Sequence, residues 1–222
     1  MIYITGDMHG DIDRFKSKEL RRLKKGDTLI VCGDFGFVWD GSKKEKRLLG
    51  WIGKRRYNTL FVEGANDNLA LLNSYPQVDY AGGKVREISG RLRLICRGEI
   101  LEIEGRKIFA FGGGAGDDDI NDTPNQEGGE MPSTQEIENA WLNLRDVGYK
   151  VDYIVTHKPS SKIRQFLMLG TESTDTLDTF LNEVREKCEY SCWFFGSIHM
   201  NKRIPPHEMA LFTAVVPAQG DL

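Results

Sequence analysis

The chain opens with Ile2-Tyr3-Ile4-Thr5-Gly6-Asp7-Met8-His9-Gly10-Asp11, the stretch around which its fold is organised. A short run of β-branched and aromatic residues stops at a glycine, which is the pattern of a buried strand followed by a tight exit turn. The turn presents Asp7 and His9, two positions apart. Carboxylate oxygen and imidazole nitrogen are ligands that suit Mn, Fe or Zn, so the opening stretch predicts a metal site at a strand end.

The same pattern of an apolar run and a polar exit occurs twice more. Residues 28–32 (TLIVC) end in Gly33-Asp34-Phe35-Gly36, and residues 59–62 end in the polar segment 63–68. Apolar residues at helical spacing predict helices over 11–25 and 42–57, the second with Leu48, Leu49, Trp51 and Ile52 facing inward. Alternating strands and helices predict a parallel sheet, and ligand-binding groups gather at the carboxyl ends of such strands.

The rest of the chain predicts a mixed pattern of strands and helices. Short strands of antiparallel type are expected at 84–89, 91–97, 100–103 and 107–111, with a hairpin turn at Glu104-Gly105-Arg106. Ser133-Thr134-Gln135-Glu136 has the capping-box pattern that starts a helix, which we expect to end near residue 147. Further strands are expected at 151–156, 192–195 and 208–216, and a helix at 173–187. The loop 112–132 contains Asp117-Asp118-Asp119, which favours a solvent-exposed turn over an additional metal site.

The bulk composition is that of one α/β domain, which we expect to span residues 1–222. Its 30 basic and 33 acidic residues give a net charge of −3, which argues against a nucleic-acid or membrane partner attracted by overall charge. No apolar run is long enough to span a bilayer, and no secretory leader pattern opens the chain. The four cysteines are scattered, which is typical of a reduced, cytoplasmic protein.

Three of the four histidines stand directly after predicted strands. These are His9, His157 and His199. A lone histidine is most simply a surface residue or a hydrogen-bonded core residue. Three at equivalent strand exits, together with Asp7 and Asp34, instead indicate one shared centre.

Five motifs, each at a strand end, resemble the ordered motifs of the calcineurin-like metallophosphoesterases. They are Gly6-Asp7-Met8-His9-Gly10, Gly33-Asp34-Phe35-Gly36, the turn Gly64-Ala65-Asn66-Asp67, Thr156-His157-Lys158-Pro159 and Gly196-Ser197-Ile198-His199. The resemblance implies an α/β fold, a four-layer α/β/β/α sandwich with two mixed sheets. It also implies a dinuclear metal site between the sheets.

Residue roles follow from this resemblance motif by motif. Asp7, His9 and His199 would bind the first metal, and His157 would bind the second. Asp34 would bridge the two ions and is the expected catalytic carboxylate. The implied cofactor is a divalent metal, with Mn expected first and Fe or Zn as alternatives. In the family's chemistry, two ions lower the pKa of a shared water and clamp the phosphoryl oxygens.

The third and fifth motifs depart from the family patterns Gly-Asn-His-Asp/Glu and Gly-His-x-His. Ala65 stands in the place of an Asn ligand of the second metal, and Ser197 in the place of a His ligand. Asn66 stands where the family has a His that contacts phosphate or assists the leaving group. We keep Asn66 as the expected catalytic and substrate-binding residue, although an amide exchanges no proton near pH 7. A one-residue shift would bring Asn66 into the ligand place. We therefore expect one tight metal site and a weakened or absent second one.

Two functions are compatible with these residues. The first is a metal-dependent phosphoesterase that hydrolyses a phosphomono- or diester, with a phosphorylated small molecule or nucleotide as the expected substrate. Nucleic acid stays a further candidate, and no membrane partner is expected. The second is a catalytically degenerate protein that keeps the fold for binding or as a scaffold. The fold alone does not choose between them.

Overall fold

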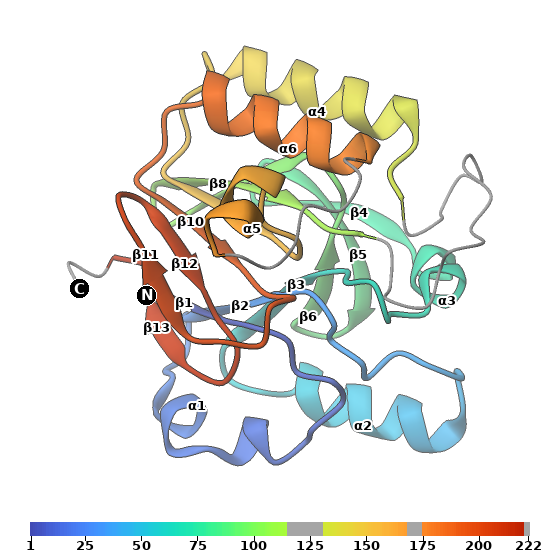
Figure 1. The fold of residues 1–222 in the computed structure, drawn as a ribbon. Helices are drawn as coiled ribbons and strands as arrows, with labels where there is room; N and C mark the ends of the chain where they lie inside the picture. Colours follow the sequence, from blue (N-terminus) through green and yellow to red (C-terminus); the bar gives the residue numbers. More distant parts are fainter. Residues whose placement is uncertain (115–130, 168–174, 220–222) are drawn as a thin grey trace.

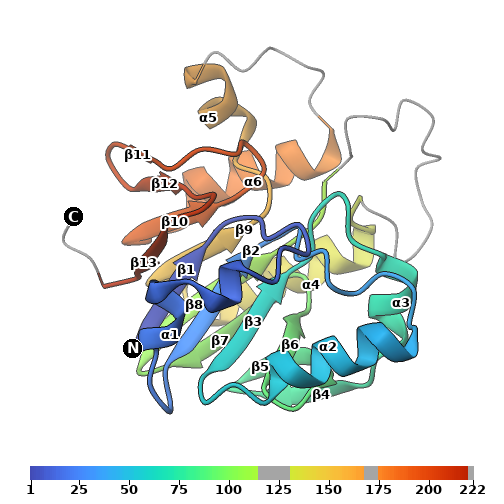
Figure 2. The ribbon, with the colours of Figure 1, turned by 90° about the horizontal axis from the view of Figure 1, so that it is seen from below.

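Two β-sheets lie face to face, and helices cover their outer sides (Figures 1 and 2). The computed structural model describes residues 1–114, 131–167 and 175–219. Its strands are β1 (Ile2–Thr5), β2 (Thr28–Cys32), β3 (Asn58–Val62), β4 (Gln77–Tyr80), β5 (Gly83–Ser89), β6 (Leu92–Ile95), β7 (Glu99–Ile103), β8 (Arg106–Phe111), β9 (Tyr153–Thr156), β10 (Cys192–Phe195), β11 (Lys202–Ile204), β12 (Glu208–Ala210) and β13 (Val215–Pro217). Its helices are α1 (Lys18–Arg22), α2 (Lys43–Gly53), α3 (Leu69–Ser74), α4 (Thr134–Asp146), α5 (Ser161–Phe166) and α6 (Thr176–Lys187), with a 3₁₀ turn at Arg14–Lys16.

Both sheets are mixed. Within the described residues, the first has seven strands in the order β13-β1-β2-β3-β6-β5-β4, and β1, β2, β3 and β6 are parallel to their neighbours in that run. The second has six strands in the order β11-β12-β10-β9-β8-β7, with β12, β10, β9 and β8 parallel. The remaining pairs are antiparallel, including the β7–β8 hairpin that turns at Glu104-Gly105 as expected.

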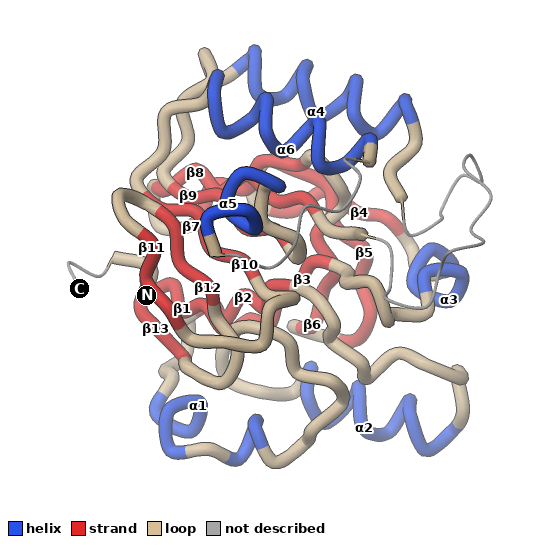
Figure 3. The backbone as a smooth tube through the Cα atoms, in the orientation of Figure 1, coloured by secondary structure: helices blue, strands red, loops and turns tan. Residues whose placement is uncertain are grey.

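The apolar residues of the central strands serve two cores at once. In β2, Ile30 and Cys32 point into the core between the sheets, whereas Leu29 and Val31 point to the helices outside the first sheet. A strand that is buried on both faces reads as a continuous apolar run, which is why TLIVC shows no alternation. A third core lies between the second sheet and its helices. The predicted four-layer α/β/β/α sandwich is therefore confirmed (Figure 3).

The outer helices bury one apolar face each. Helix α2 packs Leu49 and Ile52 against the first sheet, and α6 packs Phe180 and Val184 against the second. Helix α4 begins as predicted, because the Ser133 side chain accepts the Glu136 N–H at 3.3 Å and Glu136 completes the capping box. Helices α4 and α6 lie beside each other over the second sheet (Figure 1).

The expected helix over 11–25 is wrong. Only a 3₁₀ turn and the five-residue α1 form there, separated by Ser17, whose hydroxyl accepts the Leu20 N–H at 3.3 Å as the cap of α1. Leu23 is already extended. The sparse apolar residues of this segment reach the core from two short turns rather than from one continuous helix face.

Two further expectations are corrected. Trp51 does not face inward: it is 38% exposed, and the Arg55 guanidinium lies 3.7 Å above its ring. The strand expected over 208–216 is two strands, because the chain crosses from β12 in the second sheet to β13 in the first. The short elements α3, α5, β4 and β11 were not expected from the sequence.

Asp117–Asp119 lie outside the described residues, as does the start expected for the helix at 173; the described helix begins at Thr176. Among the described helices, none combines the length and apolar character that a membrane crossing requires.

The stacked pair Phe35 and Phe61 allows a test of the outer core. Phe61 is fully buried, and its ring stacks on Phe35 with centroids 4.2 Å apart. Replacing Phe61 by Ala should lower the free energy of unfolding by about 3–5 kcal/mol, because it leaves a cavity in a packed core. Urea denaturation measures the change. Leu142→Ala, at a position that is 45% exposed on α4, is the control and should cost less than about 1 kcal/mol. Equal losses for the two variants would contradict this assignment of the core.

Candidate metal centre

The candidate residues come together because strand ends of both sheets meet at one place. Asp7 follows β1, Asp34 follows β2, and Asn66 lies in the turn after β3, all in the first sheet. His157 follows β9 and His199 lies beyond β10, both in the second sheet. The backbone N–H of Ser197 donates to both carboxylate oxygens of Asp7, at 3.2 and 3.0 Å, and so joins the two sheets at the site.

Asp7, His9 and His199 form one compact group of possible ligands. His199 Nε2 lies 3.2 Å from Asp7 Oδ2 and 3.0 Å from His9 Nε2, and His9 Nε2 lies 4.0 Å from Asp7 Oδ2. Asp7 is fully buried, whereas the side chains of His9 and His199 are 39% and 53% exposed. The group therefore has a buried anion at its base and two imidazoles open to solvent.

This donor set fits a divalent metal ion. Ligand atoms bound at about 2.1 Å stand roughly 3 Å apart when they are neighbours around one ion. The His199 distances to Asp7 and His9 have this spacing. One carboxylate with two imidazoles suits Mn, Fe and Zn better than Mg or Ca, which prefer oxygen ligands. Among the described residues, this is the group of three whose donor atoms lie within metal-binding distance of one another.

Asp34 links this group to the rest of the site. Its Oδ2 lies 3.8 Å from His9 Nδ1, and its Oδ1 lies 3.7 Å from His157 Nε2. Asn66 donates twice to Asp34, from its backbone N–H to Oδ1 at 3.0 Å and from its side-chain amide to Oδ2 at 2.8 Å. Burial raises the pKa of Asp34, but His157 and the Asn66 hydrogen bonds outweigh burial, and the pKa is lowered from its usual value. Asp34 is therefore a charged carboxylate at neutral pH.

His157 is buried between the two carboxylates. Its Nδ1 lies 3.5 Å from Asp7 Oδ1 and 3.2 Å from the Cys32 carbonyl oxygen. Burial lowers the pKa of His157, but hydrogen bonding to Asp7 and the charges of Asp7 and Asp34 outweigh burial and raise it to about 9. In the metal-free protein His157 is therefore protonated at neutral pH. A metal ion bound through Nε2 would take the place of a proton.

The exit turns need unusual backbone. Among the described residues, seven non-glycine residues have positive φ, and four of these belong to the predicted motifs: His9, Asp34, Ser197 and His199. Such strained positions gather at functional sites. Glycine is required where two of the turns touch a carboxylate, since a Cβ at Gly64 would overlap Asp34 and one at Gly196 would overlap Asp7.

Sequence reasoning missed two residues that hold these turns. Buried Asp67 accepts the backbone N–H groups of Phe35, Gly36 and Gly64 at 3.1, 2.8 and 2.9 Å, and so ties the turn after β3 to the turn after β2. Arg14 donates to the Asp7 carbonyl oxygen, to Thr5 Oγ1 at 2.8 Å and to the Phe212 carbonyl oxygen at 2.6 Å. Asp67 is the last residue of the third motif, so the sequence did contain a signal for it. Arg14 gave no sequence signal, because its role depends on the fold, which brings Phe212 from the far end of the chain beside Thr5 and Asp7.

The altered positions differ in how they meet the site. Asn66 meets Asp34 through both its backbone N–H and its side-chain amide, which donate to the two carboxylate oxygens. Ala65 is half-buried and brings no donor atom. Ser197 meets Asp7 through its backbone N–H.

The raised pKa of His157 predicts how metal-free stability depends on pH. Protonated His157 stabilises the fold fully below its unfolded pKa of about 6.5, and this stability is lost as the pH rises toward about 9. Asp34, with a lowered pKa, stays charged over this range and adds no slope. The free energy of unfolding should fall by about 1.4 kcal/mol per pH unit in this range, measured by urea denaturation with a chelator present. In His157→Gln the slope should flatten, and an unchanged slope would contradict the assignment.

Comparison with known proteins agrees with this geometry. A model of the calcineurin-like phosphoesterase family matches residues 1–201, a span that contains all five motifs. A search of curated proteins found no match. Members of this family typically bind divalent metals and act on phosphoesters. Because the match covers nearly the whole chain and the two-sheet fold agrees with it, the chain belongs to the calcineurin-like phosphoesterase family.

Proposed function

We propose that this protein is a metal-dependent phosphoesterase with one strong metal site. Asp7, His9 and His199 would hold the ion, with Asp34 completing the site, and Mn²⁺ is the first candidate. The observation that carries the proposal is the buried Asp7 carboxylate beside two solvent-exposed imidazoles. Asp7 Oδ2 lies 3.2 Å from His199 Nε2 and 4.0 Å from His9 Nε2. The family match supports the reaction class, which is phosphoester hydrolysis.

The second metal site would be weak. His157 and Asp34 offer ligand atoms on opposite sides of a 3.7 Å gap, and Asn66 lies against Asp34 as the nearest further donor. Neither Ala65 nor the Ser197 hydroxyl replaces the ligands that the family pattern has there, since an alanine has no donor and a hydroxyl is a poor ligand for a transition metal.

The chain's own residues define the chemistry that remains. A bound divalent ion at this site supplies Lewis acidity, which lowers the pKa of coordinated water and draws charge from the phosphoryl oxygens. Asp34, charged at neutral pH, would orient the attacking water, and the Asn66 amide would donate to a phosphoryl oxygen. Asn66 has no proton to give to a leaving group. Substrates with good leaving groups should therefore react best.

A degenerate binding or scaffold protein is the alternative function. It is favoured by one observation, the loss of donor or acid groups at Ala65, Asn66 and Ser197 together. Under either function we propose a phosphorylated small molecule or nucleotide as the ligand, in a cytoplasmic setting. Nucleic acid is the next class to test.

Hydrolysis of bis(4-nitrophenyl) phosphate with added Mn²⁺ tests the enzyme directly. Turnover should require the metal, and Asp34→Asn should lower kcat/KM by more than about 100-fold, because losing a ligand costs at least as much as an outer-shell change. Asp40→Asn, the same substitution in the exposed loop that follows, is the matched control. Turnover that survives in Asp34→Asn, or none in the metal-loaded protein, would favour the binding or scaffold function.

Restoring the family residues tests the weak second site. The triple variant Ala65→Asn, Asn66→His and Ser197→His should bind a second Mn²⁺ and raise kcat, because it returns two ligands and a proton donor. Ser197 has φ of 58°, a region that histidine tolerates, as His199 does at 47°. Ser191→His, at an exposed position just before β10 and so at the opposite end of that strand from Ser197, controls for an added imidazole. Calorimetry counts the ions, and a variant that binds two yet gains no activity would contradict the assigned defect.

A further inference from the structure

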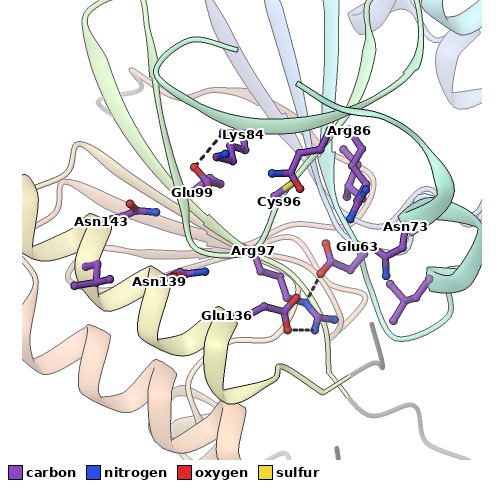
Figure 4. Close-up of a pocket in the computed structure, with 14 residues that line it drawn as sticks. Glu63, Asn73, Lys84, Arg86, Cys96, Arg97, Glu99, Glu136, Asn139 and Asn143 are labelled. Carbon is purple, nitrogen blue, oxygen red and sulfur yellow. Dashed lines mark hydrogen bonds and ion pairs between the residues drawn. The ribbon is translucent and has the colours of Figure 1, made fainter. Parts of the chain in front are cut away.

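We propose that Arg97 is a positioning residue for the metal centre, acting through Glu63 on the turn 63–68. The proposal deepens the proposed function, since it concerns the same metal site. It rests on a group of three charged side chains, Glu63, Arg97 and Glu136, which we call the charge triad (Figure 4); Glu63 and Arg97 are buried.

The triad joins three parts of the fold. Arg97 lies between β6 and β7, and its Nε donates to Glu63, the residue that directly follows β3. Arg97 Nη1 donates to Glu136 Oε2 and to the Met131 carbonyl oxygen, both at 3.2 Å. The side chains of Arg97 and Glu63 are only 4% and 5% exposed, and that of Glu136 is 32% exposed. Through Arg97, helix α4 outside the second sheet is therefore connected to a strand exit of the first.

Glu63 depends on Arg97 for its charge balance. A buried carboxylate without a partner is costly, and removing one member of a buried ion pair typically costs about 3–5 kcal/mol. The triad also lines a polar cavity of about 430 Å³ (Figure 4). The Glu63 carboxylate therefore borders open space, and the ion pair with Arg97 is the charged contact that holds it there.

From Glu63 the constraint passes directly into the metal site. The Glu63 carbonyl oxygen accepts the Gly113 N–H at 2.9 Å, and a Cβ at Gly112 would lie 2.5 Å from the Glu63 carboxylate carbon. Glu63 is thus fixed through both its main chain and its side chain. The next residue, Gly64, packs directly on Asp34, and Asn66 two residues later donates twice to it. A shift of Glu63 would therefore move the groups that orient the shared carboxylate.

The substitution Arg97→Gln separates this role from a general contribution to stability. It should weaken Mn²⁺ binding about 10-fold, as outer-shell changes at metal sites do, measured by titration calorimetry without substrate. It should also speed amide hydrogen exchange in the peptide covering 63–68, where the Gly64 and Asn66 N–H groups are bonded to Asp67 and Asp34. Arg97→Lys keeps the charge and should recover part of the metal affinity.

A second buried ion pair provides the matched control. Arg185 on α6 donates to Glu208 Oε1 at 3.0 Å, and the Glu208 side chain is 1% exposed, but this pair lies at the other end of the second sheet, beside β12. Arg185→Gln should lower the free energy of unfolding as Arg97→Gln does. It should leave Mn²⁺ affinity and exchange in 63–68 unchanged.

Two results would overturn the proposal. One is an Arg97→Gln variant with wild-type Mn²⁺ affinity and wild-type amide exchange in 63–68. The other is an Arg185→Gln variant that weakens Mn²⁺ binding and speeds exchange in 63–68 as much as Arg97→Gln does. If Arg97→Gln does not fold, Glu63→Gln replaces it, because Arg97 then keeps Glu136 and the same effects are expected. If the wild-type protein binds no Mn²⁺, the proposed function fails, whereas the exchange measurement still decides the role of Arg97.

Discussion

Two carboxylates buried against one imidazole are the constraint on which this structure depends. Asp7 and Asp34 are almost completely shielded from water, and His157 lies between them. Buried charges of one sign must be compensated, or the fold loses several kcal/mol. Here the compensation comes from the proton on His157 and from backbone N–H groups of Ser197 and Asn66. His157 and Ser197 come from strand exits of the second sheet, so the meeting of the two sheets at this point stabilises carboxylates that the first sheet buries.

This arrangement explains how the fold tolerates the altered motifs. The N–H of Ser197 bonds Asp7, and the N–H of Asn66 bonds Asp34. These bonds come from the backbone, so they are formed whatever the side chain is, and the turns keep their shape. Glycine at 64 and 196, which the close contacts require, is present. If the second site is weak as proposed, Ala65 and Ser197 would alter the ligands of the centre while these backbone bonds and glycines still hold its turns.

The sequence predicted the features that depend on residues close together in the chain. Apolar runs such as 28–32 indicated buried strands, and the polar residues after them indicated where the site would lie. It could not predict what distant partners decide. Residues 11–25 form two short turns because Ser17 caps α1, and residues 208–216 divide because the chain changes sheets. Arg97 resembled any strand-end arginine until the fold placed it beside Glu63.

The residues of the two proposed metal sites differ in how strongly they support a bound ion. His157 would be needed even without a second metal, since its charge balances Asp7 and Asp34 in the buried interior. It is therefore weak support for two ions. His9 and His199 are largely exposed, contribute little burial and adopt positive φ, and they direct their Nε2 atoms at each other across 3.0 Å. Positive-φ backbone at both histidines is an unfavourable feature that stability alone does not call for, and the proposed metal site gives it a physical reason.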